Sequence, residues 1–166
     1  ATRESIEQRC FTLLARQAPV ATDLRTITAG MRIISDLERM GDLAVHVAKL
    51  ARMRFPEHAV PQELRPIFLE AGHVAESLVA QTATVIAKLD VEAAAALEAE
   101  DDLMDQLHRQ LFNELLVKDW PHGMEAAIDI TLLGRYYERF ADHAVSVARR
   151  VVYLVTGERE MHASAD

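Results

Sequence analysis

Apolar residues recur every three or four positions along most of this chain, the spacing that gathers them on one face of an α-helix. Proline, glycine and capping residues divide the pattern into five stretches, which we predict as helices: residues up to Pro19, from there to Phe55, and then 61–89, 91–118 and 121–157. No stretch shows the alternation of a strand. The expected fold class is therefore all-α.

Helix-breaking residues are scarce, so the helices are long and the loops short. The chain has six glycines and five prolines, where average usage gives roughly 20. Asp90 is placed to cap the fourth helix and Gly157 to end the fifth. Helices joined by short loops pack as antiparallel neighbours, which predicts an up-and-down bundle with a loose tail at 158–166.

The chain contains an internal repeat. Shifting it by one hundred positions aligns residues 38–48 with residues 138–148, and seven of these eleven positions are identical. The second copy has three predicted helices within 61–157, whereas residues 1–56 hold only two. We therefore expect tandem three-helix units, with the first helix of the first unit, roughly 40 residues, upstream of Ala1. A two-helix unit leaves apolar surface bare, which predicts dimerisation.

Charge and composition exclude several function classes. The chain has 26 acidic against 18 basic residues and a net charge of -8, which opposes binding to nucleic acid. The longest stretch without charge, 77–87, is too short to span a membrane. A single cysteine, Cys10, fits a reducing cytoplasm. Glycine-rich phosphate loops and the common hydrolase motifs are missing, so we expect no enzyme.

Paired acids at helical spacing are the candidate chemistry. Positions i and i+4 share a helix face, and three such pairs occur: Glu38 with Asp42, Asp101 with Asp105, and Glu138 with Asp142. If the fourth and fifth helices are neighbours, their four acids meet, and four anions at one place favour a cation among them. Oxygen ligands suit Mg²⁺, Mn²⁺, Ca²⁺ or iron, and a nearby His108 or His143 would admit Zn²⁺ or Ni²⁺. His46, one turn beyond Asp42, is a further candidate ligand.

Two other interpretations of these acids stay open. The pairs can be ordinary salt bridges, for example Arg135 with Glu138 or Arg32 with Asp36, in which case the chain is a structural assembly module. Alternatively, Glu70 and His73, a Glu-x-x-His pattern, invite a di-metal carboxylate oxidase of the ferritin kind. That site needs the pattern twice, and the repeat does not duplicate it.

The repeated motifs resemble those of the PhoU family of phosphate-signalling regulators. The resemblance rests on Leu37 to Asp42 and on Tyr137 to Ala144, and it is supported by the junction from Leu14 to Arg25 and by Glu100 to Asp105. It covers nearly all of residues 4–157, and the run 132–139 is most similar to actinobacterial members.

The resemblance implies a cytoplasmic, non-enzymatic adaptor that negatively regulates phosphate uptake and phosphate-starvation signalling. Such an adaptor links the ATPase subunit of the phosphate ABC transporter to a sensor histidine kinase. The resemblance also implies metal at the paired acids, with Fe, Zn, Mg or Mn as the ion. One site would use Asp101, Asp105, Glu138 and Asp142, and the other would keep only Glu38 and Asp42.

Overall fold

The computed structural model describes residues 2–117 and 120–158, and every regular element in these ranges is helical. The elements are α1 Thr2–Gln17, α2 Ala21–Arg54, the short 3₁₀ helix η1 Gln62–Leu64, α3 Arg65–Lys88, α4 Val91–Leu115 and α5 Gly123–Thr156. The predicted all-α fold is confirmed. Of the predicted tail, residues 159–166 lie outside the described residues. No helix in the described ranges is long and apolar enough to cross a membrane.

The helix ends follow local chemistry in most places. The Asp90 side chain accepts a hydrogen bond from the Ala93 N–H at 2.9 Å and so caps α4 as predicted. Gly157 ends α5 in the left-handed conformation at φ +78°. The predicted start of the third helix at Pro61 is wrong. Pro61 precedes η1, and α3 begins at Arg65 with Pro66 in its first turn. Both prolines have the fixed φ that a helix start favours, so Pro61 starts the 3₁₀ helix and Pro66 starts the α-helix.

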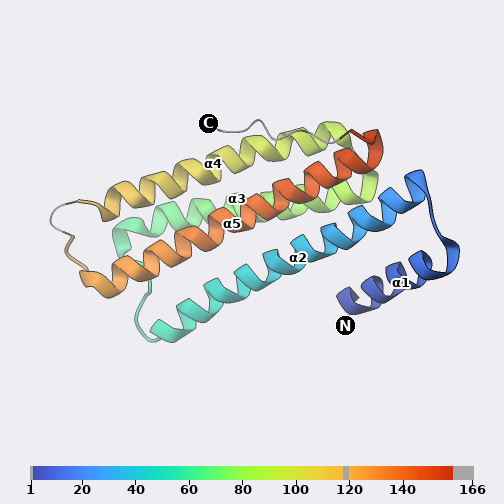
Figure 1. The fold of residues 1–166 in the computed structure, drawn as a ribbon. Coiled ribbons are helices and arrows are strands. Elements are labelled where there is room, and N and C mark those ends of the chain that lie inside the picture. Colours follow the sequence, from blue (N-terminus) through green and yellow to red (C-terminus); the bar gives the residue numbers. More distant parts are fainter. Residues whose placement is uncertain (1, 118–119, 159–166) are drawn as a thin grey trace.

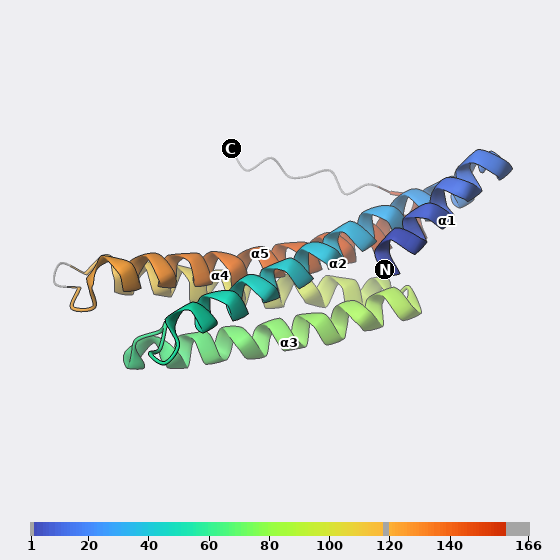
Figure 2. The same ribbon diagram turned by 90° about the horizontal axis from the view of Figure 1, so that it is seen from below.

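The two longest helices, α2 and α5, lie antiparallel through the middle of the molecule (Figure 1). α4 runs antiparallel along α5, and α3 packs on both of them on one side (Figure 2). α1 folds back along the first half of α2. The last three helices therefore form a three-helix bundle, and α2 joins it through α5.

The main core lies where α3, α4 and α5 meet. Its centre is formed by fully buried side chains, among them Leu78, Leu97 and Val147, and α2 adds Ile33 and Met40. Burying one leucine side chain contributes about 2 kcal/mol, so this core stabilises the bundle of the last three helices.

A smaller core closes the end of the bundle near η1. Leu64, Ile67, Leu111 and Ile130 are buried there, and Trp120 packs against them. The Trp120 indole N–H donates to the Gly123 carbonyl at 2.8 Å. Trp120 thus anchors the start of α5.

Candidate functional site

Four acids of the second repeat lie on the facing helices α4 and α5. Asp101 and Asp105 are one turn apart on α4, and Glu138 and Asp142 are one turn apart on α5. The two helices pack directly against each other. Asp142 raises the pKa of Asp101, and Asp105 and Glu138 raise that of Asp142, so the charges act on one another. We call Asp101, Asp105, Glu138 and Asp142 the acidic cluster.

The acidic cluster holds charge at an electrostatic cost. Burial raises the pKa of Asp101 to about 6, with the charges of Asp142, Asp105 and Asp102 as further causes. Burial, followed by the charge of Glu138, also raises the pKa of Asp142. Both carboxyls therefore bind a proton more readily than free aspartate does. A bound cation or a basic partner side chain would relieve the same repulsion.

Three arginines lie around the acidic cluster. Arg135 forms an ion pair with Glu138, and Arg109 lies 3.9 Å from Asp105. Arg149, whose charge lowers the pKa of Asp101, bonds Glu98 on α4 at 3.1 Å. The predicted pair of Arg135 with Glu138 is therefore confirmed. These contacts are exposed or partly exposed, and exposed ion pairs of this kind contribute at most about 1 kcal/mol.

The donor atoms of the acidic cluster suit a hard cation, but the side chains do not form a ligand shell. Within residues 2–117 and 120–158, no group of three or more His, Cys, Asp or Glu side chains is arranged to hold a metal ion. Neither candidate histidine completes one. His143 reaches away from the cluster to Asp36 at 3.1 Å, and His108 packs edge-on against Phe112. Metal at these residues stays a prediction.

The acid pair of the first repeat has a different setting. Glu38 forms an ion pair with Arg3 of α1, and Arg3 also bonds Glu7 at 3.0 Å. Asp42 is exposed and lies 3.9 Å from Arg39. The helix facing Glu38 thus supplies a cation, whereas the helix facing Glu138 supplies acids. The two repeats share the motif without sharing its electrostatics.

The remaining candidate ligands, His46 and the Glu-x-x-His pattern of Glu70 and His73, lie on the surface of the bundle. The His46 ring packs on Tyr136, and its Nδ1 is 2.6 Å from the Asp42 carbonyl oxygen. Glu70 and His73 of α3 are both exposed. A di-metal oxidase needs such residues inside the bundle, so this arrangement does not support that alternative.

Two buried acids join α2 to α5, a role that the sequence reasoning missed for both. Asp36 of α2 accepts one hydrogen bond from Arg150 at 2.6 Å and contacts His143 at 3.1 Å, and both of these partners are on α5. The predicted pair with Arg32 is therefore wrong, because partners on the neighbouring helix reach this buried position. Asp129 of α5 accepts two hydrogen bonds from Arg54 of α2, at 2.5 and 3.0 Å.

These buried acids could have been suspected from the pattern. Asp36 falls between Ile33 and Met40 in the apolar stripe of α2, and Asp129 directly precedes the buried Ile130. An acid in a core stripe needs a partner, because an unpaired buried charge is costly. The chain position of that partner does not follow from the stripe.

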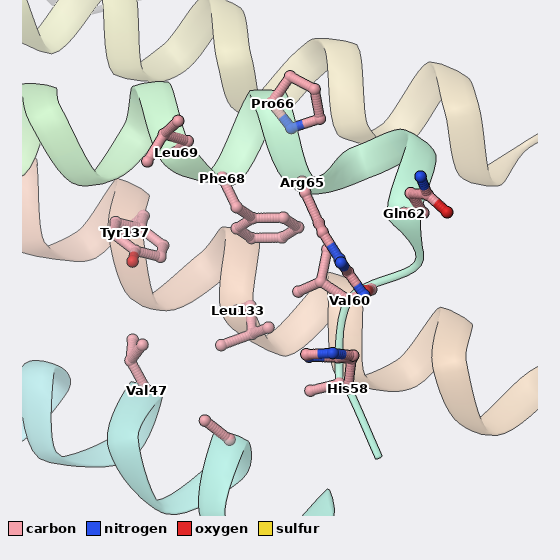
Figure 3. A pocket seen from close by; sticks show the side chains of 12 residues that line it. Val47, His58, Val60, Gln62, Arg65, Pro66, Phe68, Leu69, Leu133 and Tyr137 are labelled. Carbon is pink, nitrogen blue, oxygen red and sulfur yellow. The ribbon is translucent and has the colours of Figure 1, made fainter.

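An apolar groove opens between α2 and α3, with α5 as its floor. Two adjoining pockets of about 640 and 440 Å³ form it, and both are lined by Val47 and Tyr137. Leu133 and Phe68 complete the floor and one wall of the larger pocket, while Arg65 and His58 lie at one end (Figure 3). We call this the α2–α3 groove.

Comparison with known proteins places these features in a family. The PhoU domain model matches residues 1–51 and 68–151. PhoU homolog 2 of Mycobacterium tuberculosis, a "phosphate-specific transport system accessory protein", is 53% identical over 151 residues, which are 91% of this chain and 71% of that protein. PhoU homolog 1 of Mycobacterium leprae is 51% identical over 158 residues, which cover 95% and 71% of the two chains.

Solved structures agree with this placement. The chain is similar to the phosphate transport system regulatory protein PhoU from Streptococcus pneumoniae, with a TM-score of 0.82, 30% identity, and coverage of 96% of this chain and 74% of that one. PhoU from Pseudomonas aeruginosa gives the same TM-score and identity over 94% and 75% of the two chains. With a matching domain model, close relatives and a shared bundle, this chain belongs to the PhoU family.

Proposed function

We propose that this chain is a regulatory accessory protein of a phosphate transport system and that it lowers phosphate uptake and phosphate-starvation signalling without catalysing a reaction. The observation that carries the proposal is its 53% identity to an accessory protein of phosphate-specific transport. The test is complementation in a bacterium lacking its own family member. We expect the chain, expressed there, to restore repression of phosphate-starvation genes in high phosphate. Continued derepression with the protein present would contradict the proposal.

In this proposal the chain works in the cytoplasm as an adaptor between the ATPase subunit of a phosphate ABC transporter and a sensor histidine kinase. The acidic cluster is the surface that we assign to partner contact. Its carboxylates lie on two packed helices, and the repulsion within it makes pairing with a basic partner surface favourable.

Pull-down with the transporter ATPase and with the cytoplasmic part of the kinase tests this assignment. The variant Glu138→Gln/Asp142→Asn should lose at least tenfold in affinity for one of the two partners. The pair Glu38→Gln/Asp42→Asn is the matched control, with the same substitutions at the same spacing in the other repeat. Equal binding by both variants and the unmodified chain would remove the acidic cluster from the interface.

We also propose that the acidic cluster takes up a divalent cation, Mg²⁺, Mn²⁺, Zn²⁺ or Fe²⁺. All four side chains are exposed or half-buried and can change rotamer, and a cation would offset the repulsion that raises the pKa of Asp101. Calorimetric titration with Mn²⁺ and with Zn²⁺ should give heat for the unmodified chain and none for Glu138→Gln/Asp142→Asn. No heat with either ion in the unmodified chain would refute the proposal.

Self-association completes the proposal. Phe11 is 55% exposed, and Leu13 and Leu24 are also exposed on α1 and α2. Large apolar side chains left in water favour association of two chains. Sedimentation at micromolar concentration should therefore give twice the mass of 18.6 kDa. A single species at 18.6 kDa would contradict a homodimer.

A further inference from the structure

Each copy of the repeated motif carries an arginine that the fold leaves in water. The copies share the pattern Glu-Arg-x-x-Asp, and Arg39 and Arg139 hold its second position. The Arg39 side chain is 64% exposed and lies 3.9 Å from Asp42 of the same helix. Arg139 is exposed and, among the residues that the structure describes, forms no ion pair. Neither guanidinium is thus needed to hold the bundle together.

The two arginines belong to stripes of side chains that flank the contact between α2 and α5. The members share one face of each helix through spacings of three, four or seven residues, and they are Arg32, Asp36 and Arg39 of α2 and Arg139, His143 and Arg150 of α5. Asp36 joins the two stripes, because it contacts both His143 and Arg150. None of the six lines the α2–α3 groove. We call these six residues the α2–α5 strip.

The register of the two antiparallel helices brings Arg39 and Arg139 near each other (Figure 1). The two partners of Asp36 are seven residues apart on α5, so Asp36 is level with their midpoint. Arg39, three residues further along α2, is then level with His143. Arg139 precedes His143 by four residues, which is about 6 Å along the helix axis. Two long, exposed side chains can reach a common point across such an offset.

We propose that Arg39 and Arg139 of the α2–α5 strip bind inorganic phosphate between them, as monohydrogen phosphate. The proposal rests on the proposed function, which it extends from regulating phosphate uptake to contacting phosphate directly. A guanidinium presents parallel N–H donors that match two oxygens of a phosphate, so two arginines can hold one phosphate from two sides. Arg32, which is exposed and forms no ion pair in the described ranges, adds positive charge on the same face.

Carboxylates beside the two arginines give the site a preference among anions. Asp42 follows Arg39 by three residues, and Asp142 holds the same place after Arg139. Monohydrogen phosphate has a P–O–H group that can donate to such a carboxylate, whereas sulfate carries no proton at neutral pH. The site should therefore accept phosphate and repel sulfate. Asp36 does not oppose the ligand, because it is buried and already paired across the two helices.

Calorimetric titration of the full chain with inorganic phosphate tests the site. The buffer has low salt, so that exposed charges are little screened, and a chelator, so that no metal ion bridges phosphate to the acids. Arg39→Gln/Arg139→Gln should weaken binding at least tenfold. Arg9→Gln/Arg52→Gln is the matched control and should stay within twofold of the unmodified chain. It removes the same charge from two exposed arginines that form no ion pair among the described residues.

Two further measurements separate a phosphate site from general attraction between charges. Arg39→Lys/Arg139→Lys keeps both charges but loses the forked donors, and it should weaken phosphate binding at least threefold. Sulfate should bind the unmodified chain at least tenfold more weakly than phosphate, and Asp42→Asn/Asp142→Asn should bring the two affinities within twofold. All the substituted side chains are exposed, so the variants should fold as the unmodified chain does, which circular dichroism checks.

Three results would overturn the proposal. They are no phosphate binding by the unmodified chain, an equal loss in Arg39→Gln/Arg139→Gln and in the control variant, and equal affinity of the unmodified chain for sulfate and phosphate. None of them would touch the accessory role in phosphate transport, because complementation tests that role without measuring phosphate binding.

Discussion

Neutralising one acid of the acidic cluster should stabilise the fold in a pH-dependent way. Asp101 has its pKa raised from 3.8 to about 6, first by burial and then by the charges of Asp142 and Asp105. The folded state therefore holds the Asp101 proton more tightly than the unfolded state does, and stability falls as the pH rises through about 6. The variant Asp101→Asn keeps the shape of the side chain and removes the charge.

The magnitude follows from the size of the shift. A rise to about 6 from 3.8 corresponds to about 3 kcal/mol at 1.36 kcal/mol per pKa unit. Asp101 is partly exposed, so solvent screening reduces the effect to about 1 kcal/mol. We expect Asp101→Asn to raise the free energy of unfolding by about 1 kcal/mol near pH 7.5, and the gain to shrink toward zero as the pH falls to about 4.

Urea unfolding followed by circular dichroism measures the free energy of unfolding near pH 7.5 and near pH 4. The buffer contains a chelator so that the carboxylates hold no cation. Glu114→Gln, an exposed acid further along α4, reports the general effect of removing one negative charge and should change stability by less than about 0.5 kcal/mol. A loss of stability in Asp101→Asn that is equal at both pH values would refute the reasoning, because the repulsion would then be absent.

Three further perturbations test the packing. Arg54→Leu leaves Asp129, 3% exposed, buried without its partner and should cost about 3 kcal/mol in chemical unfolding, whereas a small loss would show that water reaches that acid. Leu78→Ala should cost about 3 kcal/mol by opening a cavity in the core, and Leu69→Ala, 64% exposed, should cost under about 1 kcal/mol; equal losses would contradict the core assignment. Gly157→Ala should lower the melting temperature by a few degrees, equivalent to about 1 kcal/mol, because φ is +78° there; an unchanged melting temperature would mean that the helix end frays.

The bundle could be predicted from the sequence because its signals are local. Apolar spacing shows each helix face, and Asp90 and Gly157 mark helix ends through their own backbone contacts. The start of α3 could not be placed as well, since Pro61 and Pro66 both satisfy the same local rule. Tertiary packing of Leu64 in the smaller core separates the two possibilities.

The candidate site could be predicted only in part. The spacing of four along α4 and α5, together with their packing, was enough to bring Asp101 near Asp142. The ion pair of Glu38 with Arg3 and the partners of Asp36 depend on which helices are neighbours and on their register. Such contacts join residues 35 to 114 positions apart, and periodicity along one helix carries no information about them.

The two paired acids along the α2–α5 interface fix how the halves can move. Asp36 and Arg54 are 18 residues apart on α2, which is about 27 Å along the helix axis. Sliding α2 by one turn, about 5.4 Å, would part both acids from their partners at once and leave two buried charges unmet. A force applied at one end of the bundle would therefore rotate α2 and α5 together as one rigid unit instead of sliding one helix along the other. A displacement at one end of these helices would then also displace the other end.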